Sequence, residues 1–126
     1  MRIHLAVAAG GALGAVGRTL LVAAVEPLFY PGFPVGTLAA NVIGSFLLGM
    51  LIEVMALVWS PSPELRAFLV VGVLGTFTTF SAFSLEAVEL IRTGAIGAAV
   101  AYAAASVRLS LVGVFAGMRL FRLALS

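Results

Sequence analysis

Polar side chains recur at helical spacing within apolar segments of the sequence. Tyr102, Ser106 and Ser110 recur every fourth residue, and Asn41 and Ser45 have the same spacing. Residues four apart share one face of an α-helix, so the three hydroxyls form a polar stripe. An unpaired amide is costly in an apolar medium, so Asn41 must face protein or water. A structural hydrogen bond between helices and a place in a polar pathway both remain open for it.

A second unusual stretch runs from Gly72 to Ser84, where Gly, Thr and Ser interrupt an apolar segment. These residue types let a helix break, and a break frees backbone carbonyl and N–H groups. Inside a membrane, such groups are tolerated only where they line a cavity or bind an ion. Phe80 and Phe83 share one helical face, and the edges of their rings carry partial positive charge. The stretch therefore predicts a pathway for an ion or small solute, with ordinary packing as the alternative for the two rings.

The elements that must position these residues follow from composition. Of the 126 residues, 63% are hydrophobic and 10% are charged, whereas a soluble domain has about 25% charged residues. One membrane-spanning helix uses about 20 residues. We expect an all-α membrane protein with a single transmembrane domain over 1–126, a break in the middle of the third span, and no soluble domain. The expected spans are about 3–25, 35–59, 67–91 and 95–120.

The same composition excludes several classes of protein. The basic residues are all Arg and are scattered singly, which argues against nucleic-acid binding. With no Cys, no Asp and one His, the chain has no thiolate metal site and no acid–base or nucleophile constellation, so we do not expect an enzyme. No carboxylate precedes Glu26, although a proton-coupled small multidrug exporter needs one in its first span. That class is the less favoured alternative.

Small residues at four-residue spacing predict close helix packing. The stripes are Gly10 and Gly14; Gly36, Ala40 and Gly44; and Gly113 and Gly117. Because four helices offer few internal faces, so many stripes favour an oligomer. Four Arg lie on the side of the termini and two on the other side, a small positive-inside bias that leaves both orientations open.

Three segments in this order resemble the Fluc (CrcB) family of bacterial fluoride channels, and the resemblance covers essentially the whole chain. The segments are Gly10–Arg18, Gly36–Phe46 and Gly72–Phe83. The resemblance implies a passive, fluoride-selective channel in the bacterial inner membrane, which relieves fluoride toxicity by export. It also implies an antiparallel, dual-topology homodimer in the lipid bilayer. A non-conducting partner subunit of such a channel is the alternative.

The resemblance also assigns roles to residues. It implies a fluoride pathway lined by Asn41, Thr79, Phe80, Ser81, Phe83, Ser106 and Ser110. Further polar members would be Arg18, Thr37, Glu86 and Tyr102. A structural Na⁺ would be held on the dimer axis by the backbone carbonyls of Gly75 and Thr78, with no organic cofactor.

Three positions depart from the family pattern. Ala82 stands where a Thr usually follows the Ser, and Thr19 stands where an aromatic residue often follows the Arg. Arg108 lies near the middle of the fourth span, where a cation costs about 2.5–3.5 kcal/mol. Its spacing from Ser106 and Ser110 points it away from the polar stripe. An ion pair with Glu53, contact with backbone carbonyls across a dimer, and origin in an engineered or divergent chain are the explanations left open.

Overall fold

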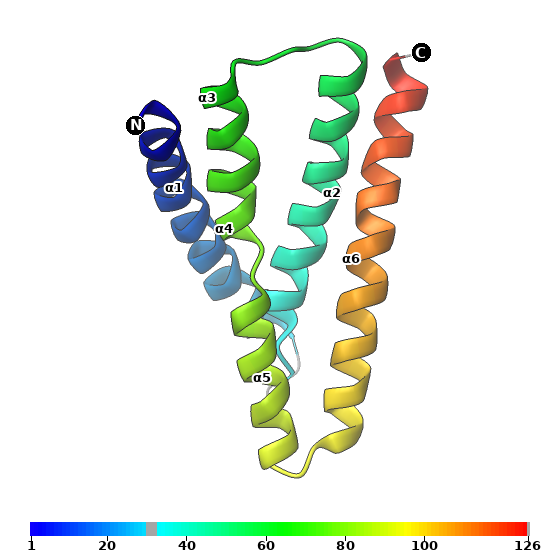
Figure 1. The fold of residues 1–126 in the computed structure, drawn as a ribbon. Helices are drawn as coiled ribbons and strands as arrows, with labels where there is room; N and C mark the ends of the chain where they lie inside the picture. Colours follow the sequence, from blue (N-terminus) through cyan, green and yellow to red (C-terminus); the bar gives the residue numbers. More distant parts are fainter. Residues whose placement is uncertain (30–32, 126) are drawn as a thin grey trace.

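The structure is a computed structural model that describes residues 1–29 and 33–125, and every regular element in these ranges is helical (Figure 1). The elements are α1 (Arg2–Val25), a short 3₁₀ turn η1 (Glu26–Leu28), α2 (Val35–Leu57), α3 (Pro63–Arg66), a π-helical stretch η2 (Ala67–Leu74), α4 (Gly75–Phe77), α5 (Phe80–Arg92) and α6 (Ile96–Leu125). The elements from α3 to α5 follow one another along one membrane-spanning segment, with two non-helical residues between α4 and α5. The expected all-helical architecture is confirmed.

Four segments are long and apolar enough to cross a membrane: Arg2–Leu28, Val35–Leu57, Pro63–Arg92 and Ile96–Leu125. The third begins four residues earlier than expected because Ser62 caps it, its hydroxyl accepting a hydrogen bond from Leu65 N at 3.2 Å. The fourth continues five residues further than expected, to Leu125. Its last turn contains Arg122, which favours helix although it is not apolar, so a helix end placed by apolar content alone comes too early.

Two pairs of helices make up the bundle. In Figure 1, α2 runs side by side with the C-terminal part of α6, and both chain ends lie at the same end of the molecule. Glycines allow this contact, because a Cβ atom on Gly49 would meet the carbonyl oxygen of Val114, and one on Gly117 would meet that of Phe46. The predicted packing role of the Gly113 and Gly117 stripe is confirmed.

The other pair is α1 and the first half of the third span. A Cβ atom on Gly72 would lie 2.8 Å from the Cα of Gly10, and one on Gly14 would meet Thr76 Oγ1 and the Val73 carbonyl. Backbone therefore touches backbone, as a stripe of small residues permits. The Gly36, Ala40 and Gly44 stripe is buried as well.

The outer surface of the bundle is apolar. Leu20 is 65% exposed and Phe115 is 69% exposed, whereas Tyr102 is the only large side chain among the described residues that is fully buried. This distribution suits a bilayer, which solvates apolar side chains on the outside. The chain is a multi-pass membrane protein.

The structure does not bring Arg108 to Glu53. Arg108 is exposed, as its spacing predicted, whereas Glu53 is buried in α2. Gly49 lies against Val114 and Met118, so Glu53, one turn further along α2, is level with the C-terminal part of α6. That level is several turns from Arg108, so the suggested ion pair within the chain is wrong.

Candidate functional site

The third span changes backbone geometry at two threonines in its middle. Thr78 (φ −85°, ψ 152°) and Thr79 (φ −150°, ψ 125°) are extended, α4 ends before them at Phe77, and α5 begins after them at Phe80. Thr79 caps α5, because its hydroxyl accepts a hydrogen bond from Ala82 N at 3.1 Å. Two extended residues at this depth leave several backbone groups without helical partners.

Asn41 of α2 provides two of the missing partners. Its Nδ2 donates to the Thr79 carbonyl at 3.0 Å, and its Oδ1 accepts from Thr79 N at 2.7 Å. The amide thus binds both backbone groups of one residue, much as a neighbouring strand would. Asn41 therefore makes a structural hydrogen bond between helices; it also lines a cavity, and its place in a polar pathway stays a prediction.

Arg18 of α1 provides another partner, since its Nε donates to the Thr76 carbonyl at 3.1 Å. The Thr76 hydroxyl lies 2.7 Å from the Gly72 carbonyl oxygen in its own helix and 3.1 Å from the Gly11 carbonyl oxygen of α1, and it has one proton to donate. Among the described residues, no group donates a hydrogen bond to the carbonyls of Gly75 or Thr78. These two oxygens therefore retain their capacity to bind a donor or a cation.

A cavity of about 400 Å³ lies where α2, the interrupted third span and α6 meet. All the residues expected to line a pathway, except Ser81, contribute to its wall: Asn41, Thr79, Phe80, Phe83, Ser106 and Ser110. Ser81 lies beside them, with its hydroxyl 3.2 Å from Thr79 Oγ1. Gly75 and Thr78 also line the cavity.

Aromatic rings continue from this cavity towards the start of α6. Phe80 and Phe83 have centroids 5.4 Å apart, and Phe83 and Tyr102 have centroids 5.1 Å apart. Phe33, which the sequence reasoning missed, meets Tyr102 edge to face at 5.6 Å. The hydroxyls of Tyr102 and Ser106 are buried and have no hydrogen-bond partner among the described residues. A buried hydroxyl without a partner is unfavourable unless something else binds it.

Two carboxylates, Glu86 and Glu26, bind groups at the start of α2. Thr37 Oγ1 donates to Glu86 Oε1 at 2.6 Å, joining α2 to α5. At the start of α2, Gly36 N donates to Glu26 Oε1 at 3.1 Å, so Glu26 binds one of the N–H groups that have no partner within that helix. Glu26 was not among the predicted site residues, and its role depends on a contact between the end of the first span and the start of the second.

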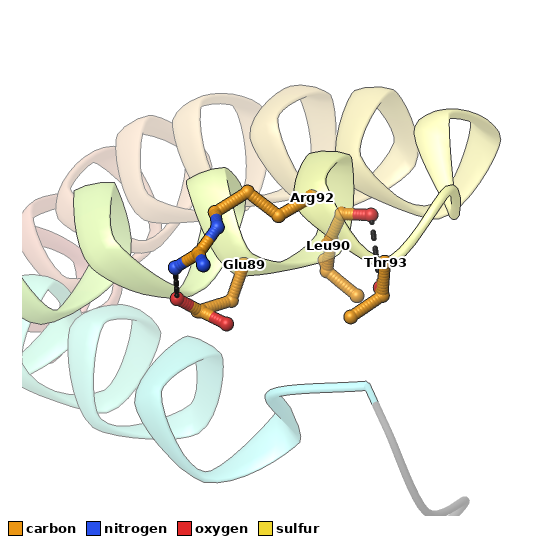
Figure 2. A network of polar contacts seen from close by, with 4 residues as sticks. All are labelled: Glu89, Leu90, Arg92 and Thr93. Carbon is orange, nitrogen blue, oxygen red and sulfur yellow. Dashed lines mark hydrogen bonds and ion pairs between the residues drawn. The ribbon is translucent and has the colours of Figure 1, made fainter.

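The end of α5 beyond Glu86 is held by local contacts (Figure 2). Arg92 pairs with Glu89 at 2.8 Å on the exposed surface, and Thr93 Oγ1 donates to the Leu90 carbonyl at 3.1 Å. Both contacts are within one turn, so they stabilise the helix end. An exposed pair of this kind contributes little to stability, typically ~0.5 kcal/mol.

Two other departures from the family pattern have simple surroundings. Thr19 donates its hydroxyl to the Ala15 carbonyl at 2.9 Å, a bond within its own helix. Ala82 lies in the first turn of α5, where its N–H is already bound by Thr79.

Known proteins match the chain over nearly its whole length. The family model described as "CrcB-like protein, Camphor Resistance (CrcB)" matches residues 5–118. A protein of Rhodospirillum centenum named fluoride-specific ion channel FluC is 54% identical over 126 residues, covering all of both chains. Proteins of the same name from Agrobacterium fabrum and Rhizobium meliloti are 52% and 51% identical, each covering more than nine-tenths of both chains. The chain belongs to the CrcB family.

Proposed function

We propose that this chain is a passive, fluoride-selective channel that lets cytoplasmic fluoride leave the cell. The observation that carries the proposal is the cavity between α2, the third span and α6, which combines neutral hydrogen-bond donors with two phenylalanine rings. The relatives that match the chain over nearly its whole length are named fluoride-specific ion channels.

Fluoride would exchange its water for groups on the cavity wall. The Ser106 hydroxyl is buried and without a partner among the described residues, so it is available as a donor. Phe80 and Phe83 can turn positive ring edges to the anion. Thr79 and Ser110 supply further hydroxyls on the wall, and the Ser81 hydroxyl lies 3.2 Å from that of Thr79. No described Arg lines the cavity, so an anion would bind there without a fixed charge that would hold it tightly.

The membrane potential supplies the driving force. Hydrogen fluoride crosses membranes as a neutral acid and ionises inside, so fluoride accumulates. An interior-negative potential then drives the anion outwards, by about 2.3 kcal/mol per 100 mV for one charge. The pathway therefore needs neither a nucleotide nor a coupled proton.

The proposed assembly is an antiparallel homodimer with the interruption of the third span near its centre. The small difference in Arg between the two sides would let the chain insert in both orientations. In this arrangement the exposed Phe80, which is 77% accessible, would be covered by the second copy.

Structural Na⁺ fits the carbonyl arrangement of the chain. Oxygen ligands suit a hard cation, and the Gly75 and Thr78 carbonyls have no described donor. The neighbouring carbonyls of Thr76 and Thr79 are occupied by Arg18 and Asn41. Each chain would therefore offer the carbonyl oxygens of Gly75 and Thr78, and a second copy would supply the remaining ligands of the Na⁺.

The test compares two ring substitutions in proteoliposomes. Phe80→Ile removes a ring from the cavity and should lower the fluoride efflux rate at least tenfold. Phe115→Ile is the matched control, because Phe115 is exposed on α6 and lies outside the cavity. Its efflux should equal that of the unmodified protein. Native-rate efflux from Phe80→Ile would place the pathway elsewhere.

The same assay distinguishes the alternative. If the unmodified chain folds and inserts but passes no fluoride by itself, it is a partner subunit. Addition of a second, conducting chain would then be required for efflux.

A further inference from the structure

An exposed cation, Arg108, lies in the middle of α6. Arg108 is exposed on the face opposite the buried stripe that contains Tyr102 and Ser106. No hydrogen bond or ion pair joins it to another of the described residues. A charge in hydrocarbon needs a counter-ion or water, and the described residues supply no counter-ion to Arg108.

A carboxylate of a second copy is a poor candidate for this partner. The chain has no Asp and five Glu. Glu26, Glu86 and Glu89 accept hydrogen bonds from described donors. Glu53 is buried in α2, and Glu64 lies in the first turn of α3. None is both exposed and near the middle of a span.

The position of Arg108 along α6 brings it closer to one membrane boundary. At 1.5 Å per residue, the 30 residues of α6 span about 45 Å, against about 30 Å of hydrocarbon. In a centred helix, about 7.5 Å of each end lies outside the hydrocarbon, and Arg108 lies about 10 Å inside the boundary on the Ile96 side. Helical side chains lean towards the N-terminus of their helix, which directs the guanidinium to that same boundary.

The surface between Arg108 and that boundary is open. Gly97, Ala101 and Ala104 lie on the same helical face and are all exposed. A Cβ atom on Gly97 would meet nothing within 4 Å. On the other side of Arg108 the same face carries Phe115, a bulky side chain that is 69% exposed. Space for a polar group to approach the guanidinium is therefore on the N-terminal side.

We propose that Arg108 binds the phosphate of an anionic membrane lipid whose headgroup descends along the furrow formed by Gly97, Ala101 and Ala104. A guanidinium can bind two phosphate oxygens at once, and it is less strongly hydrated than an ammonium. The bound phosphate neutralises the cation where the protein does not. Arg108 and the three furrow residues do not line the cavity, so the site does not depend on fluoride conduction.

The test measures binding of phosphatidylglycerol to the full-length protein in a phosphate-free detergent, by titration with native mass spectrometry. Arg108→Leu removes the cation, and Ala104→Leu fills the furrow; each should weaken the tightest binding step about tenfold. Val112→Leu is the matched control for added bulk, and Arg119→Leu is the control for lost charge. Both controls should bind within twofold of the unmodified protein.

Three outcomes would overturn the proposal. Unchanged binding by Arg108→Leu would show that this residue does not hold the lipid. An equal loss of phosphatidylglycerol binding in Arg119→Leu would show that binding depends on the net charge of the protein and not on the position of Arg108. A loss of self-association in Arg108→Leu without added lipid would assign the cation to a second copy of the chain. None of these measurements contains fluoride, so their results do not depend on the proposed channel activity.

Discussion

Replacing Asn41 by Leu removes both hydrogen bonds that hold the extended residue Thr79. The substitution keeps the number of side-chain heavy atoms and the branching at Cγ, so the packing of α2 against the third span changes little. What changes is the pairing of two backbone groups. The Thr79 N–H loses Oδ1 at 2.7 Å, and the Thr79 carbonyl loses Nδ2 at 3.0 Å.

The expected size of the effect follows from these two bonds. Hydrogen bonds between membrane helices average about 0.6 kcal/mol, and a buried group left unpaired costs about 1–3 kcal/mol. For the pair, about 2 kcal/mol is a reasonable value. That free energy corresponds to about a 30-fold rise in the population in which Thr79 has left its position.

Amide hydrogen–deuterium exchange measures that population directly. Exchange at Thr79 should be about 30-fold faster in Asn41→Leu than in the unmodified protein. Ser45→Ala is the matched control, because Ser45 lies one turn further along α2, lines the same cavity and makes no hydrogen bond to the third span. Its Thr79 exchange should be unchanged. If Asn41→Leu exchanges at the native rate, Asn41 does not hold the interruption.

Three further substitutions test packing and the polar groups. Gly14→Ala should lower the melting temperature, because its Cβ atom would meet Thr76 Oγ1 and cost about 1–3 kcal/mol. The control Gly97→Ala, whose Cβ atom meets nothing within 4 Å, should leave the melting temperature unchanged or raise it. Equal melting temperatures of the two variants would contradict this packing. Thr37→Val leaves Glu86 without its described donor and should destabilise the protein by about 1–3 kcal/mol in chemical unfolding, and native stability would show that the bond contributes nothing. Ser106→Ala should slow fluoride efflux about tenfold while stability is kept or increased, because a buried unpaired hydroxyl is lost; parallel loss of efflux and stability would indicate a structural role.

Much of the fold follows from composition and small-residue spacing. Few charges and four apolar segments require membrane spans, and glycines four apart indicate where helices touch. These signals are local or compositional, so one sequence is enough to see them. The run from Gly72 to Ser84 likewise includes Thr78 and Thr79, the two extended residues.

The partners of the site residues could not be predicted in the same way. Asn41 is 38 residues from Thr79, and Arg18 is 58 residues from Thr76. In both cases the side chain binds a backbone carbonyl, a group that every residue carries, so no residue type at the other end reveals the contact. The π-helical stretch Ala67–Leu74 is uniformly apolar, and its sequence has no feature that separates it from an ordinary helix.

The suggested pairing of Arg108 with Glu53 shows the same limit. Opposite charges in two apolar spans are natural partners, but depth decides whether they meet. The contact of Gly49 with Val114 and Met118 sets the register of α2 against α6 and separates the two charges by several turns. Register depends on backbone packing, which the charges themselves do not encode.

The most direct test of the central claim is ion efflux from liposomes that contain this chain alone. Vesicles are loaded with potassium fluoride or potassium chloride, and efflux is started with a potassium ionophore. We predict rapid loss of fluoride and chloride retention equal to that of empty vesicles. Equal efflux of the two anions, or no efflux of fluoride from folded and inserted protein, would contradict the account.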